Sequence, residues 1–372
     1  MEDRNPALKS AKKGIDIPLL GVTILLVFIG LLAIYDASVV SAFRDFGDKL
    51  YYFKNQLIWA GISLTALGFF SFFNYHKLLK LSLPILGLAI VLLVLVLIPH
   101  IGTEAYGARR WINIGNFTFQ PSEFAKLAVI FYTASIMAKF ENFKIYLKDV
   151  LSVLFLPITI LTALVLVEPD LGTAFILVAI TLAIYFVGHS PIWHLMLVIP
   201  MALVSTIAAV ITQPYRLERL KSFIDPNYDP QGASYQINQI IIAISSGNPL
   251  FGVGIGSSRS KFAFIPEVHS DAIFAVLVEE TGFIGALFLI SLFLFLITRA
   301  LNIARNASDY QGKILAMGII GMLSLQVLLN LASNVALVPL TGVPLPLISY
   351  GGSSLLVTMS SIGILLNIKR QA

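Results

Sequence analysis

The sequence has no cysteine among its 372 residues and carries little charge. The missing thiols exclude disulfides and thiolate metal sites. Charged residues make up 12% of the chain and apolar residues 57%, whereas a soluble domain has roughly twice that charge fraction. A soluble fold is therefore not expected. The net charge of +5 is expected to report on topology and contact with anionic lipid, and nucleic acid is not an expected partner.

Apolar stretches long enough to cross about 30 Å of hydrocarbon recur along the chain. They are continuous and do not alternate with polar residues, which argues against a β-barrel. Because a backbone in lipid must satisfy its own hydrogen bonds, they are predicted to be helices. We predict an all-α, polytopic membrane protein, one domain over residues 1–372. The ten predicted spans are 16–38, 55–73, 78–98, 122–139, 150–167, 171–187, 191–211, 272–298, 313–336 and 351–368.

Basic residues predict the orientation of these spans. An even number of spans places both termini on one side, and loops rich in Lys and Arg stay in the cytoplasm. Lys and Arg are concentrated in the N-terminal segment, near 77–80, 139–148 and 299–313, and at the C-terminus. Both termini are therefore predicted to be cytoplasmic. The unusual residues then face outward, many of them in a long extracytoplasmic loop of about 212–271, between the seventh and eighth spans.

Asp271 stands at the end of this loop, directly before an apolar run. A carboxylate at the hydrocarbon boundary is costly to desolvate, which points to a function for its charge. The alternative is that Asp271 caps the eighth helix. Glu267 and His269 lie close by in sequence and suggest a metal site. A cage built from protein ligands alone is not expected, but one carboxylate helping to hold Mg²⁺ or Mn²⁺ on a pyrophosphate is plausible chemistry.

Glu123 and Lys126 lie near the start of the fourth span, just after Pro121. Proline suits the first turn of a helix, and an acidic side chain there complements the helix dipole. The spacing of three residues places Glu123 and Lys126 on one face, where they can pair. Two interpretations remain open. The pair is either a self-neutralising pair in the membrane, or its lysine faces a central cavity and meets an anionic substrate.

Further cations lie in the outer loops. Arg109 and Arg110 precede Trp111, and Arg216 and Arg219 are three residues apart at the start of the long loop. Guanidinium groups suit phosphate because they bind it in bidentate geometry. For the first pair, the alternative is an interfacial aromatic anchor flanked by solvated arginines.

Residues 235–244 are predicted to form an amphipathic or re-entrant helix. The glycine-rich stretch 252–257 follows it, and Lys261 comes next. No strand precedes these glycines, so a dinucleotide site is not expected. A glycine turn near a pyrophosphate remains a hypothesis.

Polar residues elsewhere have structural explanations. Asp170 is predicted to cap the sixth span, whereas Glu168 has no capping role. Gln326, Asn330 and Asn334 recur every four residues on the ninth span. Such a ladder is more typical of hydrogen bonding between helices than of catalysis.

Several strings, taken in this order and spacing, resemble the SEDS family, the shape, elongation, division and sporulation proteins. The resemblance covers nearly the whole chain, and the last string is the most specific. The strings are Gly107-Ala108-Arg109-Arg110-Trp111, Gln120-Pro121-Ser122-Glu123-Phe124-Ala125-Lys126, Glu168-Pro169-Asp170-Leu171-Gly172, Pro266-Glu267-Val268-His269-Ser270-Asp271 and Gly342-Val343-Pro344-Leu345-Pro346-Leu347-Ile348-Ser349-Tyr350-Gly351-Gly352-Ser353.

The resemblance implies a peptidoglycan glycosyltransferase of the bacterial cytoplasmic membrane that polymerises lipid II for cell division or cell shape. It also implies a class B penicillin-binding protein, the transpeptidase, as partner. The stretches 215–220 and 229–232 are more similar to the division-type member, FtsW, than to the elongation-type, RodA. The chain departs from the family pattern at Ala272, where Phe is common, and at Thr281, where Leu is common. Neither change removes a charge.

The predicted reaction inverts the anomeric carbon of a lipid-linked disaccharide, with undecaprenyl pyrophosphate as leaving group. Asp271, onto which the family's essential acid falls, is the predicted general base. A divalent cation is the one cofactor considered, and no residue is assigned as a metal ligand. A lipid II flippase and a non-catalytic scaffold of the division or elongation machinery are the alternatives. The predicted substrate-binding residues are Arg109, Arg110, Lys126, Glu123, Arg216, Arg219, Lys261, Glu267, Ser349 and Tyr350.

Overall fold

The computed structural model describes residues 14–105, 108–115, 117–141, 146–232, 234–246, 248–261 and 268–372. Each predicted span coincides with a helix, although several helices extend beyond the predicted ends. These helices are α1 (Ile17–Phe46), α2 (Tyr51–Phe72), α4 (Ser82–Leu97), α5 (Pro121–Phe140), α7 (Leu156–Val167), α8 (Leu171–Val187), α9 (Ile192–Ile211), α12 (Ile273–Arg305), α13 (Tyr310–Asn334) and α14 (Gly352–Gln371).

The helices are apolar enough to make this a multi-pass membrane protein. Among the described residues, six helical segments are long and apolar enough to cross a membrane, and α4 and α8 are shorter apolar helices. Local signals fix several helix starts. Asp16 caps α1 and Asp170 caps α8, each by accepting a hydrogen bond of 3.0 Å from a backbone N–H three residues on. The predicted capping role of Asp170 is confirmed.

Short elements lie between the spans. They are α3 (Tyr75–Lys80), α6 (Leu147–Asp149), the π-helix η1 (Val150–Phe155), α10 (Pro214–Ile224), α11 (Tyr235–Ser246), β1 (Gly102–Ala105), β2 (Ala108–Ile114) and β3 (Phe117–Phe119). The predicted helix over 235–244 is confirmed as α11. The strands pair as an antiparallel sheet in the order β1-β2-β3. This small sheet lies in the predicted loop 99–121, and the all-α class holds for the spans.

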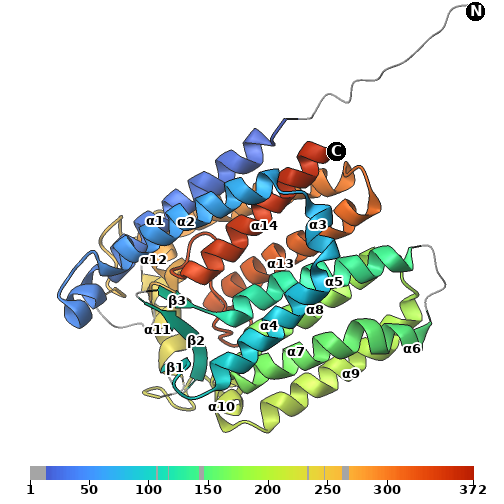
Figure 1. Cartoon of the computed structure of the whole chain (residues 1–372). Coiled ribbons are helices and arrows are strands. Elements are labelled where there is room, and N and C mark those ends of the chain that lie inside the picture. The colour runs from blue at the N-terminus through green and yellow to red at the C-terminus, as the bar shows by residue number, and fades with distance from the viewer. Residues whose placement is uncertain are drawn as a thin grey trace, which may run out of the picture.

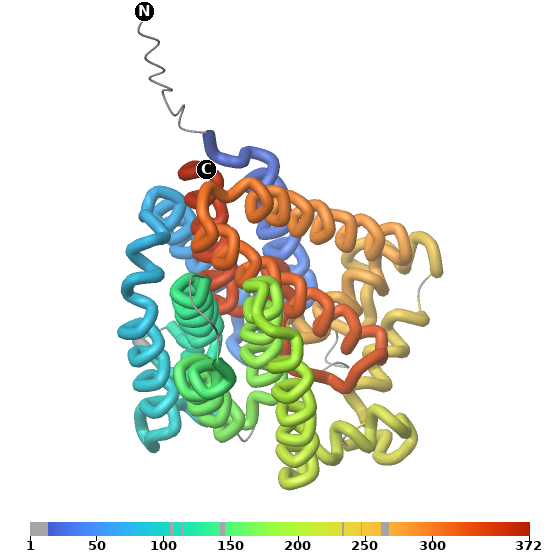
Figure 2. Tube along the Cα trace, turned by 90° about the vertical axis from the view of Figure 1, so that its right-hand side faces the viewer, coloured from blue at the N-terminus to red at the C-terminus, as the bar shows by residue number. Residues whose placement is uncertain are grey.

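The helices pack around α5 and α14. Helix α5 contacts α4, α8 and α13, while α14 packs along α2. Nearly all of α14 is buried, although its sequence is less apolar than that of most other spans. In Figures 1 and 2 the start of α1 and the end of α14 lie at the same end of the molecule. The sheet, α10 and α11 lie at the other end in Figure 1.

Helix α12 is broken at Gly282, where a continuous helix was predicted. Gly282 has φ 63° and ψ −160°, a conformation that only glycine adopts readily. A neighbouring loop replaces the hydrogen bonds that the helix loses. The Phe283 N–H donates to the Pro249 carbonyl and the Val253 N–H donates to the Glu279 carbonyl, both at 2.9 Å. The loop therefore closes the break, as buried backbone groups require.

Candidate active site

The loop that follows α13 holds the segment before Asp271 in place. The Ser349 hydroxyl donates to the Ser270 carbonyl at 2.6 Å and accepts from the Leu345 N–H at 2.9 Å. The Tyr350 N–H donates to the His269 carbonyl at 2.9 Å. The sequence motif near the C-terminus thus packs against the end of the long loop. Ser349 and Tyr350, both predicted to bind substrate, position the backbone beside Asp271.

Two asparagines of α13 bind the Asp271 main chain. The side-chain amides of Asn330 and Asn334 donate to the Asp271 carbonyl at 3.1 and 2.9 Å. Asn330 also donates to the Val343 carbonyl at 2.9 Å. The predicted bonding between helices is wrong for this ladder, because the two asparagines donate to loop carbonyls and the Gln326 amide is buried without a hydrogen-bond partner. Together the two asparagines fix the backbone from which the Asp271 side chain projects.

The Asp271 carboxylate is half-buried at the start of α12. The Ser270 hydroxyl donates to Asp271 Oδ1 at 3.0 Å. The N-cap of α12 is Ala272, and no side chain caps this helix. The alternative explanation, that Asp271 caps the helix, is therefore wrong. Gly342 lies close by, because a Cβ added there would be 3.6 Å from Asp271 Oδ2.

Glu123 and Lys126 form the predicted ion pair. Lys126 Nζ lies 2.7 Å from Glu123 Oε1, and the two side chains are only 1% and 3% exposed. Glu123 Oε2 is buried and has no hydrogen-bond partner. A buried charge pair of this kind is expensive to desolvate and is weak evidence for a purely stabilising role. The free oxygen makes Glu123 a candidate to bind a donor group of a substrate, which stays a prediction.

Arg110 and Arg216 bind backbone carbonyls near the α7–α8 turn. Arg110 donates to the carbonyls of Glu168 and Pro169 at 2.8 and 2.5 Å. Arg216 donates to the carbonyls of Ala209 and Leu166 at 2.9 and 2.7 Å. Burial lowers the pKa of Arg216, and the nearby charge of Arg110 lowers it further. Two residues predicted to bind substrate therefore lie beside one turn, and some of their N–H groups already donate to backbone carbonyls there.

Glu168 lies in the same turn with both carboxylate oxygens buried and without hydrogen-bond partners. The pKa of Glu168 is raised to about 9, mainly by burial and also by the charge of the neighbouring Asp170, while Arg110 opposes the rise. The carboxyl group is therefore neutral at pH 7, which explains how it is tolerated there.

This shift predicts a pH-dependent effect of replacing Glu168 by glutamine. The unfolded chain releases the Glu168 proton near pH 4.5, whereas the folded chain keeps it to about pH 9. The free energy of unfolding therefore falls as the pH rises between these values. Glu168→Gln should match the wild type at pH 5 and exceed it at pH 8 by more than about 1.4 kcal/mol, the equivalent of one pKa unit. Thermal unfolding in detergent between pH 5 and pH 8 measures the stability of the variant and of the wild type. A variant that is less stable at every pH would contradict the protonated state.

The remaining two arginines have different partners. Arg109 pairs with Glu104 at 3.0 Å on the sheet, and both side chains are exposed. Arg219 donates to the Leu340 carbonyl at 2.9 Å and its guanidinium lies 4.6 Å from the centroid of the Tyr215 ring. Arg219 thus contacts the loop that carries Gly342, whereas Arg109 lies on β2.

Lys261 is bound by acidic side chains of two helices. Its ammonium lies 2.9 Å from Asp36 Oδ1 and 3.5 Å from Glu280 Oε1, and it donates to the Gly256 carbonyl at 2.5 Å. The glycine-rich stretch that precedes Lys261 also binds Glu280 of α12. The Gly254 N–H donates to the Glu280 carbonyl at 3.0 Å, and the Ser258 N–H donates to Glu280 Oε1 at 3.1 Å. These N–H groups bind the broken helix rather than a pyrophosphate, so the glycine-turn hypothesis gains no support.

Glu267 lies outside the described residues. Among the residues that are described, no group of three or more His, Asp or Glu side chains is arranged to hold a metal ion. Sequence reasoning missed Gln56, which accepts a hydrogen bond of 3.2 Å from the Gly351 N–H. It also missed the three-stranded sheet, whose one signal was Gly115-Asn116 between two apolar stretches, a typical two-residue hairpin connection.

Comparison with known proteins identifies the family. A family model described as "Cell cycle protein", which covers FtsW, RodA and SpoVE, matches residues 17–372. This chain belongs to the FtsW/RodA/SpoVE family. The resemblance to the SEDS proteins is confirmed, because these are the same proteins.

Individual members of the FtsW/RodA/SpoVE family match over almost their full length. Stage V sporulation protein E of Bacillus subtilis (strain 168) is 38% identical, covering 98% of this chain and 99% of that protein. The probable peptidoglycan glycosyltransferase FtsW of Trichlorobacter lovleyi is also 38% identical, covering 95% of this chain and 92% of that protein. The match to a protein named FtsW agrees with the predicted similarity to the division type, and the sporulation protein is equally similar.

Solved structures of the FtsW/RodA/SpoVE family share the fold. Rod shape determining protein RodA of Thermus thermophilus has a TM-score of 0.70 and 27% identity, covering 96% of this chain and 97% of that chain. A chain from a structure described as a peptidoglycan synthase complex that coordinates polymerization and crosslinking has a TM-score of 0.78 and 28% identity, covering 96% and 98%. The predicted polytopic fold is confirmed.

Proposed function

We propose that this chain is a peptidoglycan glycosyltransferase that polymerises lipid II, with Asp271 as general base. The fixed backbone of Asp271 carries this proposal. Two asparagines of α13 bind the Asp271 carbonyl and Ser349 binds the Ser270 carbonyl, so the carboxylate projects from a rigid support. Such preorganisation is what a catalytic base needs. The names of the FtsW relatives support the reaction class.

In this reaction Asp271 takes the proton from the 4-hydroxyl of the acceptor sugar as that oxygen attacks the anomeric carbon of the donor. The glycosidic bond forms as the bond to undecaprenyl pyrophosphate breaks, and the pyrophosphate leaves with its negative charge. Cations stabilise that charge. The predicted cations remain Arg109, Arg110, Arg216, Arg219 and Lys261, in addition to the Glu123–Lys126 pair.

A divalent cation fits this site only if the substrate supplies most of its ligands. No residue is assigned as its ligand, because Asp271 serves as the general base, and the cation would neutralise the leaving pyrophosphate. Polymerisation assayed with and without a chelator, followed by addition of Mg²⁺ or Mn²⁺, tests this part of the proposal.

We also propose that the chain lies in the bacterial cytoplasmic membrane with both termini in the cytoplasm. The segment before α1 and the last turn of α14 are rich in Lys and Arg, as cytoplasmic segments are. The site then faces outward, where a class B penicillin-binding protein is the proposed partner. The similarity to a chain of a synthase complex that couples polymerization to crosslinking supports that partner.

The deciding experiment mixes the purified full-length chain with lipid II, with and without a class B penicillin-binding protein, and resolves the products on a gel. Ladders of glycan strands are expected. Movement of lipid II across sealed vesicles without any polymer would favour a flippase instead. No ladder under either condition would favour a scaffold.

A further inference from the structure

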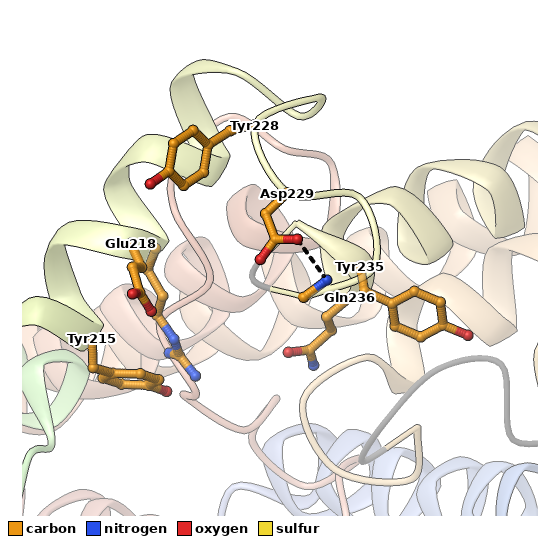
Figure 3. Close-up of a pocket in the computed structure, with 8 residues that line it drawn as sticks. Tyr215, Glu218, Tyr228, Asp229, Tyr235 and Gln236 are labelled. Carbon is orange, nitrogen blue, oxygen red and sulfur yellow. Dashed lines mark hydrogen bonds between the residues drawn. The ribbon is translucent and has the colours of Figure 1, made fainter.

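A pocket of about 740 Å³ lies between α10, the turn after it and α11. It is separate from the residues that touch Asp271. Figure 3 shows Tyr215, Glu218 and Tyr228 on one side of this space, and Asp229 and Gln236 on the other. Its lining residues are Tyr215, Glu218, Arg219, Tyr228, Asp229, Gly232, Tyr235 and Gln236.

The composition of the pocket favours an uncharged polar ligand. It combines three tyrosines with the two carboxylates of Glu218 and Asp229 and only one cation, Arg219. The two carboxylates disfavour a phosphate, and Lys221, whose ammonium lies 5.3 Å from the centroid of the Tyr228 ring, offsets them only in part. Part of the Arg219 guanidinium is already used by the Leu340 carbonyl. Carboxylates accept hydrogen bonds, the Gln236 amide both donates and accepts, and tyrosines offer apolar faces with a polar tip. Sugar rings, with hydroxyl groups around an apolar face, match that set.

The pocket adjoins the candidate catalytic carboxylate. Arg219 in its wall binds the Leu340 carbonyl, and Leu340 is two residues from Gly342, the neighbour of the Asp271 carboxylate. Two residues of backbone span at most about 7 Å. From the other side, Ile240 lies one helical turn after Gln236 and belongs to the same buried cluster as Ala272. A polymer whose reacting sugar is at Asp271 has its neighbouring sugars within reach of the pocket.

We propose that this pocket binds uncharged saccharide units of the glycan strand next to the unit that reacts at Asp271. The inference rests on the proposed glycosyltransferase function, and it adds a saccharide subsite formed by α10 and α11. In this arrangement the sugars that follow the reacting unit lie inside the pocket, where Arg219 contacts them. The pyrophosphate lies outside it, beside the other predicted cations.

The test measures binding of a β-1,4-linked N-acetylglucosamine tetramer to the purified full-length chain by saturation-transfer NMR and calorimetry. Tyr228 is 51% exposed, so Tyr228→Ala should fold normally and weaken binding about tenfold. Glu218→Gln keeps the shape of the side chain and should weaken binding about threefold. Tyr146→Ala is the control, because Tyr146 is 58% exposed and lies before α6, outside the pocket.

The outcomes separate this inference from the proposed function. Absence of tetramer binding, equal binding by all variants, or displacement of the tetramer by inorganic pyrophosphate or a short peptide would overturn the pocket assignment. Glycan ladders from the wild type together with equal tetramer binding by all variants would overturn the pocket alone. Weakened tetramer binding in both pocket variants, without any ladder from the wild type, would support the pocket and count against the polymerase.

Discussion

Replacing Asp271 by asparagine is expected to stop glycan polymerisation while leaving the protein folded. Loss of a general base typically slows a reaction by about 10²–10⁴-fold. The amide keeps an oxygen that can accept the Ser270 hydrogen bond, and the bonds from Asn330 and Asn334 reach the main chain. Folding should therefore persist. The ladder assay with lipid II measures the first effect, and thermal unfolding in detergent measures the second.

Asp48→Asn is the matched control for this prediction. Asp48 lies between α1 and α2, and its exposed carboxylate pairs with Lys54 at 2.8 Å. Exposed pairs contribute little to stability, so this variant should make ladders at the wild-type rate. Ladders of wild-type intensity from Asp271→Asn would remove Asp271 from the mechanism, whatever the control shows.

The second large effect is expected at Lys126. Lys126→Met leaves the Glu123 carboxylate buried without its partner, and breaking a buried pair in this way typically costs about 3–5 kcal/mol. We expect a correspondingly lower unfolding temperature. Glu123→Gln combined with Lys126→Met removes both charges, so the double variant should regain most of the lost stability. The comparison of the two variants by thermal unfolding isolates the cost of the unpaired charge.

The double variant also tests the functional interpretation of this pair. A pair that contacts substrate is needed for polymerisation even when the fold is restored, so we expect the double variant to make no ladder. A stable double variant that polymerises lipid II at the wild-type rate would show that the pair is only structural.

The spans could be predicted from the sequence because each is a continuous apolar run, and lipid leaves the backbone no alternative to a helix. Asp170 and the Glu123–Lys126 pair were predictable for a similar reason, since their partners lie within three residues. The partners of the arginines were not. Arg110 binds a turn 58 residues away, and Arg219 binds a carbonyl 121 residues away. A sequence pattern holds no information on contacts that depend on how whole helices pack.

The break in α12 shows the same limit. Thr281-Gly282 follows Glu279 and Glu280 between two apolar runs, and a single glycine is tolerated in a helix at a cost of about 1 kcal/mol. What breaks the helix is the loop 248–254, which supplies replacement hydrogen bonds. Neither the helix sequence nor the loop sequence alone predicts the break, because the first is compatible with an unbroken helix and the second with an ordinary loop.

This break has a consequence for how the chain enters the membrane. The segment 283–305 alone would reach about 34 Å at 1.5 Å per residue, enough to cross the hydrocarbon. The turns before Gly282 carry Glu279 and Glu280 and complete their bonding only with the loop. We therefore expect the translocation machinery to release 283–305 into lipid first. The turns that lead to Asp271 depend on the loop for their bonding, so the position of this carboxylate depends on a segment outside α12.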